Sequence, residues 1–266
     1  MGRLQLDAPA RRFLPELPEA WDAITVRQFL CHVSGIPSDS LLRRADWEGS
    51  MAAAARLSAA EPGLDSRYNN FNYVVAGKLV EAASGQGYAD FVQSRIFAPL
   101  GMSRSRVGRG WDANQATGYQ FASRRSLTTV PLWRDAGPQY DPAGRIMSSL
   151  NDVLAFVGAI RDGRLLSPAG LAEVTRPYGP ACRGTCGWFA KVAGGLPCTE
   201  KIGRVGGYST DVEFNPRGDA IVMMWSLQSW HDRSVEPRAA LRQTLLGVGP
   251  GYPEGHHTSV MAEHEG

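Results

Sequence analysis

A change of residue pattern near Gly184 constrains the fold more than any other feature of the sequence. Upstream, apolar residues recur at the three-and-four spacing of amphipathic helices, as in FNYVVAGKLVEAAS at 71–84. Downstream come CGWFAKVAG, YSTDVEFNP and DAIVMMWSLQS, which are short and rich in β-branched and aromatic residues. Asn215-Pro216-Arg217-Gly218 is a strong turn signal between the last two. Helices followed by an antiparallel meander predict an α+β fold.

Capping residues set the expected ends of four helices, which begin near residues 26, 71, 150 and 168. The section from 99 to 145 lacks such signals, and we expect it to be largely irregular. The expected N-caps are Thr25, Asn70, Ser149 and Ser167, and the expected stops of the first two helices are Gly35 and Gly85.

The length of 266 residues, with 43% hydrophobic and 20% charged residues, suits one large domain. We expect this domain to occupy residues 1–248. Residues 249–266, GPGYPEGHHTSVMAEHEG, have the composition of a disordered tail.

Charge and hydropathy narrow the classes of partner. The formal net charge of +2 gives no reason to expect nucleic acid. No run of eighteen apolar residues predicts a membrane span, and residues 1–18 lack the apolar core of a signal peptide. The compartment is therefore not fixed by this sequence.

The four cysteines do not form a disulfide scaffold. Cys31 stands alone, whereas Cys182, Cys186 and Cys198 crowd into one segment. One disulfide within this trio and three unrelated thiols are both open interpretations. No fourth ligand lies nearby in sequence, so we predict no zinc site, and no other metal or organic cofactor is indicated.

Five segments occur in a characteristic order along the chain: GRLQLDAP, ITVRQFLCHVSGIP, RYNNFNYVVAGKLVEAASGQGYADFVQSRIFAPLGM, PAGRIMSSLNDVLAFVGAI with LLSP, and GRVGGYSTDVEFNP. In this order they resemble the serine β-lactamase-related family, which includes class C β-lactamases, penicillin-binding DD-peptidases and esterases. The resemblance implies the α+β fold of that family, an amide or ester substrate (β-lactam, D-Ala-D-Ala peptide or simple ester) and relatives that are commonly exported.

Tyr68-Asn69-Asn70 matches the Tyr-x-Asn motif of this family. The resemblance implies that Tyr68 shuttles a proton between nucleophile and leaving group, and that Asn70 binds the amide side chain of the substrate. A phenol with a pKa near ~10 acts as a base only when cations favour the phenolate or its proton moves in concert. The alternative is that Tyr68 only packs its ring and Asn70 only caps a helix.

Arg204-Val205-Gly206 lies where the family carries Lys-or-His, Thr and Gly. Gly206 would let a substrate backbone approach the strand, and the Gly207 amide would contribute to an oxyanion hole. Arg204 replaces the expected Lys or His, and Val205 replaces the hydroxyl residue. Arg204 could bind a substrate carboxylate but cannot exchange a proton at ordinary pH, and the alternative is a surface arginine at a strand.

The Ser-x-x-Lys motif of the family is missing, since no serine here has a lysine three positions later. The resemblance therefore implies a chain truncated at its N-terminus, without the nucleophile helix and first strands. Two hypotheses follow: a serine hydrolase whose nucleophile lies outside this sequence, or a non-catalytic remnant (pseudoenzyme) that binds a ligand or partner in the old cleft. An uncovered sheet face would favour self-association.

Overall fold

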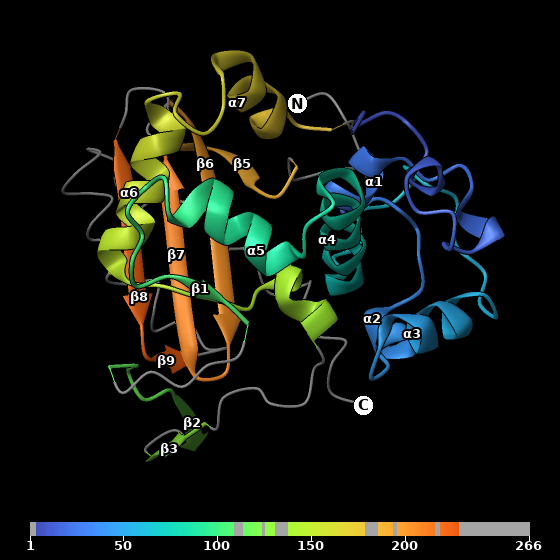
Figure 1. Cartoon of the computed structure of the whole chain (residues 1–266). Helices are drawn as coiled ribbons and strands as arrows, with labels where there is room; N and C mark the ends of the chain where they lie inside the picture. The colour runs from blue at the N-terminus through green and yellow to red at the C-terminus, as the bar shows by residue number, and fades with distance from the viewer. Residues whose placement is uncertain are drawn as a thin grey trace.

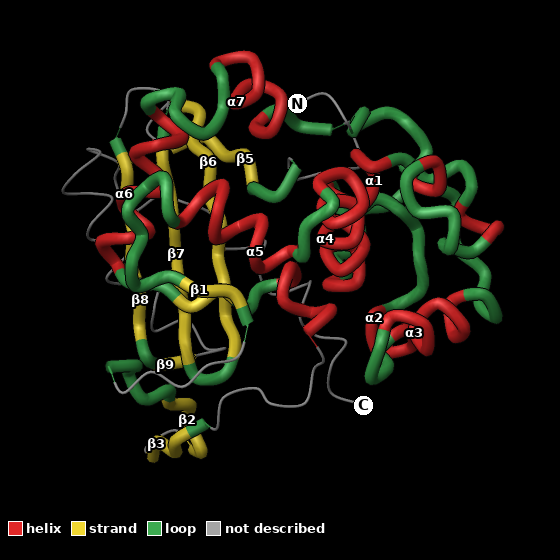
Figure 2. Tube along the Cα trace, viewed as in Figure 1, coloured by secondary structure: helices red, strands yellow, loops and turns green. Residues whose placement is uncertain are grey.

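A computed structural model describes residues 4–108, 114–123, 126–130, 138–178, 186–193, 196–215 and 219–228. The chain combines helices with antiparallel sheets, which confirms the α+β prediction (Figures 1 and 2). The predicted tail, Cys182 and the turn residues 216–218 lie outside the described residues. None of the helices in the described ranges is long and apolar enough to cross a membrane.

The helices of the described chain cluster beside and in front of the main sheet (Figure 1). A π-helical turn, Gln93–Phe97, continues α5, and a 3₁₀ helix spans Pro138–Ala143. The α-helices are α1 (Val26–Leu30), α2 (Asp39–Leu42), α3 (Trp47–Ala54), α4 (Asn70–Ser84), α5 (Tyr88–Val92), α6 (Leu150–Arg161) and α7 (Pro168–Thr175).

The strands form three sheets in the described part of the chain. The section from 99 to 145, which we expected to be largely irregular, contains in its described part short strands at 106–107, 119–123 and 126–129. The strands are β1 (Arg106–Val107), β2 (Tyr119–Ser123), β3 (Ser126–Thr129), β4 (Ile146–Met147), β5 (Phe189–Ala193), β6 (Leu196–Val205), β7 (Tyr208–Phe214), β8 (Ala220–Trp225) and β9 (Leu227–Gln228).

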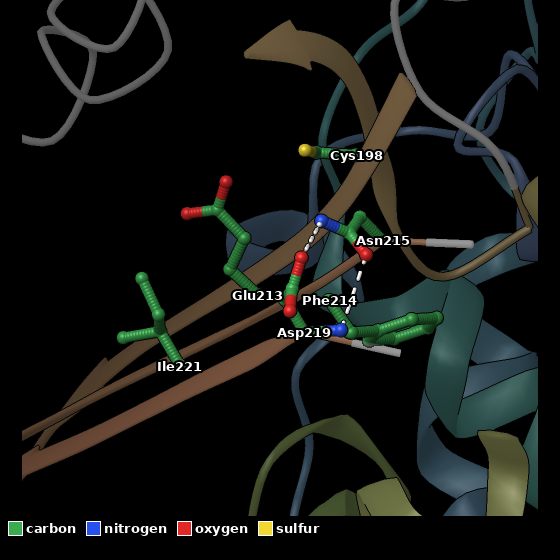
Figure 3. A pocket seen from close by; sticks show the side chains of 6 residues that line it. All are labelled: Cys198, Glu213, Phe214, Asn215, Asp219 and Ile221. Atoms are coloured by element: carbon green, nitrogen blue, oxygen red, sulfur yellow. Dashed lines mark hydrogen bonds between the residues drawn. The ribbon is translucent and has the colours of Figure 1, made fainter. Parts of the chain in front are cut away.

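The main sheet has the order β5-β6-β7-β8, and every neighbouring pair is antiparallel. The meander predicted from the sequence is therefore confirmed. The end of β7 is held to the start of β8 by Asn215 and Asp219: the Asn215 Nδ2 group donates to the Asp219 carboxylate over 2.9 Å, and the Asp219 amide donates to Asn215 Oδ1 over 3.1 Å (Figure 3). An asparagine side chain in this position supplies the hydrogen bonds of the turn.

Apolar clusters fix the positions of α4 and α6. One surrounds α4 and includes Trp21, Phe29 and Phe71, all fully buried. Another joins α6 to the sheet through Val157 and Phe214. Burial of each such side chain contributes roughly 1.5–3 kcal/mol.

Strand alternation divides the main sheet into two faces. Phe214 shares the face that α6 covers, whereas Asp211, Ile221 and Met223 lie on the opposite face. Those three residues are 5%, 6% and 8% exposed, so the uncovered face that we expected is not present at these positions. Self-association stays a prediction, but it gains no support from an open sheet face.

Three of the four predicted N-caps are confirmed, and the fourth is off by one residue. Thr25, Ser149 and Ser167 each accept a hydrogen bond from a backbone amide of the first helical turn. The N-cap of α4 is Asn69, not Asn70, because Asn69 keeps an extended backbone and its Oδ1 accepts from the Phe71 amide over 2.9 Å. Gly85 ends α4 in the left-handed conformation, as predicted.

Helix α1 is shorter than predicted, since it ends at Leu30. His32 follows with a φ of 55°, which is uncommon for a residue other than glycine. Gly35, the predicted stop, is also left-handed with a φ of 72°. The chain therefore turns away from the helix axis at His32 and passes beside the start of α4.

Candidate active site

Tyr68 and Asn70 contact each other at the start of α4. The Tyr68 hydroxyl donates to Asn70 Oδ1 over 2.9 Å, and 47% of the Tyr68 residue is exposed. Asn70 is the first residue of the helix, and its Nδ2 lies 3.5 Å from the Asp39 carboxylate. The Tyr-x-Asn segment thus presents a phenol and an amide on one accessible surface.

His32 connects this surface to the interior. Its ring lies 4.6 Å from the Tyr68 ring and 5.1 Å from the Tyr73 ring, between centroids. The Asn69 amide donates to His32 Nδ1 over 3.2 Å, and Asn72 Nδ2 lies 3.1 Å from the same nitrogen. Because Nδ1 accepts from the amide, the ring proton of the neutral imidazole is on Nε2.

Burial and the positive charge of Lys201 lower the pKa of His32 to about 3. His32 is therefore neutral near pH 7, and it orders its neighbours without adding charge. Asn69 and Asn72 hold the His32 ring in place through its Nδ1 atom, a role that the sequence did not indicate. Asn69 also donates to the Pro37 carbonyl over 2.8 Å, and buried Asn72 accepts from the Ser34 hydroxyl over 2.6 Å.

Lys201, on β6 of the main sheet, lies beside the cluster formed by the His32, Tyr68 and Tyr73 rings. Its Nζ lies 5.6 Å from the centre of the Tyr73 ring, and its charge acts on His32. Burial lowers the pKa of the Lys201 ammonium below its ordinary value. The Tyr73 hydroxyl donates to the Leu30 carbonyl over 3.0 Å, which fixes the ring against which Lys201 lies.

Arg204 lies on the other face of the same strand. The register of β6 with β7 is regular from Thr199 to Val205. Successive strand residues point to opposite faces, so Lys201 and Arg204, three positions apart, do not share a face. The structure brings Tyr68, Asn70 and Lys201 into one region, whereas Arg204 lies on the opposite face of β6. A sequence signal existed, because Lys201-Ile202-Gly203 also has a lysine followed two positions later by glycine.

Gly206 and Gly207 form the two-residue turn between β6 and β7. Their φ angles are 57° and 86°, and Val205 pairs with Tyr208 across the turn. A tight hairpin of this kind requires positive φ at both central residues. A Cβ on Gly207 would lie 2.6 Å from the backbone of Gly118, so close packing also demands glycine here. Both glycines therefore have a structural reason to be present.

The strand pairing along the outer edge of β6 changes at Lys201. Within the described residues, β5 pairs with β6 only from Leu196 to Glu200, and no strand is paired with this edge beyond Glu200. Gly203 lies in this stretch, is exposed, and has nothing within 4 Å of the place where a Cβ would be. An extended ligand could therefore approach the strand backbone beside Lys201.

The pKa of the Tyr68 phenol is raised, first by desolvation and second by the negative charge of Asp39. Tyr68 is therefore protonated at neutral pH and acts as a donor in this arrangement. Among the residues that the structure describes, no three His, Cys, Asp or Glu side chains gather as a metal site.

A Tyr-x-Asn segment at a helix start that faces a strand-borne lysine, on an α+β scaffold, defines a protein of the serine β-lactamase and penicillin-binding class. The chain belongs to the Beta-lactamase family, whose model matches residues 1–245. This finding confirms the resemblance of the five sequence segments.

Comparisons with known proteins agree with this membership. A putative penicillin-binding protein, PbpX, of Bacillus subtilis is 26% identical over 235 residues, which are 85% of this chain and 56% of that protein. The chain spans about half the length of the curated relatives it matches.

Solved structures share the fold. A D-stereospecific amidohydrolase from Streptomyces sp. superposes with a TM-score of 0.75 at 24% identity, covering 93% of this chain and 81% of that one. D-amino acid amidase from Ochrobactrum anthropi SV3, solved with D-phenylalanine, has a TM-score of 0.66 at 26% identity, covering 84% of this chain and 70% of that one.

Proposed function

We propose that this site hydrolyses an amide next to a D-configured residue by acyl transfer to a serine. The observation that carries the proposal is the contact of Lys201 with the Tyr73 ring, which in turn lies beside His32, whose ring contacts that of Tyr68. The similarity to D-amino acid amidase, whose structure holds D-phenylalanine, supports an amide substrate over a simple ester.

Lys201 and Asn70 are the proposed substrate-binding groups. The Lys201 ammonium would attract the negative charge that develops on the substrate during acyl transfer. The amide of Asn70 would hydrogen-bond the acyl side of the substrate, and the backbone near Gly203 would pair with its extended part. In this proposal Lys201 takes the role that the sequence pattern suggested for Arg204.

Tyr68 is the proposed proton donor to the leaving amine. Its raised pKa keeps the phenol protonated in the resting site. Expulsion of an amine requires a proton, and a positioned acid contributes about 10²–10⁴-fold to such a step. The phenolate formed would regain its proton from the water that then hydrolyses the acyl-serine.

The attacking serine is proposed to come from a part of the protein outside these 266 residues. The sequence contains no Ser-x-x-Lys, and the reaction needs an activated nucleophile. The same observation supports a second candidate, a non-catalytic site that binds its ligand and releases it unchanged.

Kinetics with a panel of substrates would test the proposal. The 266-residue chain and the longer protein encoded by the full upstream reading frame would each be given D-phenylalanine amide, its L-isomer as the matched control, a chromogenic cephalosporin and a nitrophenyl ester. We expect turnover of the D-amide by the longer protein alone. Binding of the D-amide by both proteins without turnover would favour the non-catalytic candidate. Covalent serine labelling of the 266-residue chain would overturn the proposed origin of the nucleophile.

A further inference from the structure

Two cysteines that are far apart in the sequence face each other. The Sγ atoms of Cys31 and Cys186 lie 3.0 Å apart, although 155 positions separate them. Cys31, which stands alone in the sequence, therefore has a cysteine beside it in space. Cys198, another member of the predicted trio, is buried on β6 and lines the separate hollow drawn in Figure 3.

The surroundings of the pair suit one protected thiol and one accessible thiol. Cys31 is 3% exposed and Cys186 is half-buried, and Val33 and Tyr178 pack around them. Arg27 lies nearby, with its guanidinium 5.8 Å from the centre of the Tyr178 ring.

A contact with Cys31 and the positive charge of Arg27 lower the pKa of the Cys186 thiol. The thiolate is the nucleophilic form of cysteine, so Cys186 is the member of the pair that an external oxidant would meet first. Asp7 holds Arg27 in place through hydrogen bonds of 2.6 and 2.8 Å, and Glu173 also contacts it.

We propose that Cys31 and Cys186 form an oxidation site that closes to a disulfide and cross-links the end of α1 to the segment entering β5. The oxidant is a low-molecular-weight disulfide. The Cys186 thiolate attacks one of its sulfurs and releases one thiol, leaving a mixed disulfide. The Cys31 thiolate then attacks the Cys186 sulfur and releases the second thiol. Two protein thiols are oxidised, one small disulfide is reduced, and the two protons pass to the released thiols.

The cross-link would tie together the two halves of the candidate site. Cys31 directly precedes His32, whose ring contacts those of Tyr68 and Tyr73. Cys186 directly precedes Gly187, where an added Cβ would lie 2.9 Å from the Tyr73 hydroxyl. The sulfurs need to approach by only about 1 Å to reach bonding distance. This inference does not depend on hydrolytic activity, because its test counts thiols and maps a bond.

Thiol titration and peptide mapping of the wild-type protein would test the proposal. Treatment with oxidised glutathione should lower the number of titratable thiols, measured in denaturant, by two. Trypsin places the four cysteines on separate peptides, because cleavage after Arg and Lys gives 28–43, 165–183, 184–191 and 192–201. We expect a disulfide-linked pair of peptides 28–43 and 184–191. A link between 165–183 and either of the last two peptides, or unchanged thiols, would overturn the proposal.

Thermal unfolding would provide a second measurement with matched variants. Oxidation should raise the Tm of the wild-type protein by about 10 °C, because the bond closes a long loop in the unfolded chain. Cys186→Ser should abolish this rise, whereas Cys198→Ser, at another cysteine of the same region, should keep it. An equal rise in Cys186→Ser and wild type would show that another pair is oxidised.

Discussion

The ammonium group of Lys201 lies 5.6 Å from the centre of the Tyr73 ring, and this contact joins the main sheet to the helix that carries the Tyr-x-Asn segment. The Tyr73 ring in turn lies 5.1 Å from that of His32, which contacts Tyr68. The positive charge of Lys201 therefore lies near the Tyr68 phenol and the Asn70 amide at the start of α4.

Replacing Lys201 by methionine should raise the pKa of His32, because the positive charge that disfavours the imidazolium is removed while the bulk of the stem is kept. NMR titration of the His32 ring in the 266-residue chain measures this directly. Arg204→Met is the matched control, since it removes the same charge from the opposite face of the same strand. It should leave the His32 titration unchanged. An equal shift in both variants would contradict the division of faces.

Lys201→Met and Arg204→Met should also differ in their effect on catalysis. In a protein that contains the nucleophile, Lys201→Met should lower kcat/KM for the D-amide by roughly 10- to 100-fold, the loss of a hydrogen bond to a charged group. Arg204→Met should change it by less than about twofold. A larger loss of kcat/KM in Arg204→Met than in Lys201→Met would indicate that Arg204 is the substrate-binding cation.

Tyr68→Phe should reduce turnover by about a hundredfold or more if the phenol donates a proton to the leaving group. Stability should change by less than about 1 kcal/mol, because the hydroxyl has one hydrogen bond, to Asn70, and the residue is 47% exposed. Tyr119→Phe, at an exposed tyrosine on β2, is the control and should have no effect. Unchanged turnover in Tyr68→Phe would remove this residue from the mechanism.

Acid should destabilise the protein partly through His32. Its pKa is about 3 in the folded state and near 6.5 in the unfolded chain, so the unfolded state binds one more proton between these values. The contribution of His32 to stability is complete above about pH 6.5 and is lost as the pH falls toward 3. The slope is about 1.4 kcal/mol per pH unit.

Denaturant unfolding of wild type and His32→Asn between pH 7 and pH 4 would measure this contribution. Asparagine tolerates the positive φ of this position, so the backbone need not change. The free energy of unfolding should fall less steeply with acid in the variant than in wild type. Parallel curves would mean that the pKa of His32 is the same in the folded and unfolded states.

The sequence predicted the elements better than the contacts between them. Alternation of β-branched residues identified β7 and β8, and the small polar residues Thr25, Ser149 and Ser167 marked helix starts, because both signals are local. Asn69 and Asn70 are both good caps, so the pattern could not choose between them.

The contacts that define the site are not local. Nothing in the neighbourhood of Cys31 indicates Cys186, and nothing near Tyr73 indicates Lys201. Both pairings follow from how the helical half packs on the sheet. The sequence pattern could not single out Lys201 for a further reason. Arg204-Val205-Gly206 and Lys201-Ile202-Gly203 are both triplets that begin with a cationic residue and end with glycine. Only strand alternation assigns them to different faces.

Gly207→Ala and Gly203→Ala should separate a structural glycine from one that borders a ligand. At Gly207 a Cβ would meet backbone atoms at 2.6 and 2.7 Å in a left-handed conformation, so we expect a loss of roughly 2–4 kcal/mol in stability. At Gly203 a Cβ meets nothing within 4 Å, so stability should change by less than about 1 kcal/mol. Binding of the D-amide should nevertheless weaken in Gly203→Ala, because the new methyl group would stand on the face of β6 that carries Lys201, next to the edge that the ligand is proposed to approach. Thermal unfolding and calorimetric titration measure the two effects. Full ligand affinity in Gly203→Ala would mean that the ligand does not lie along β6 beside Lys201.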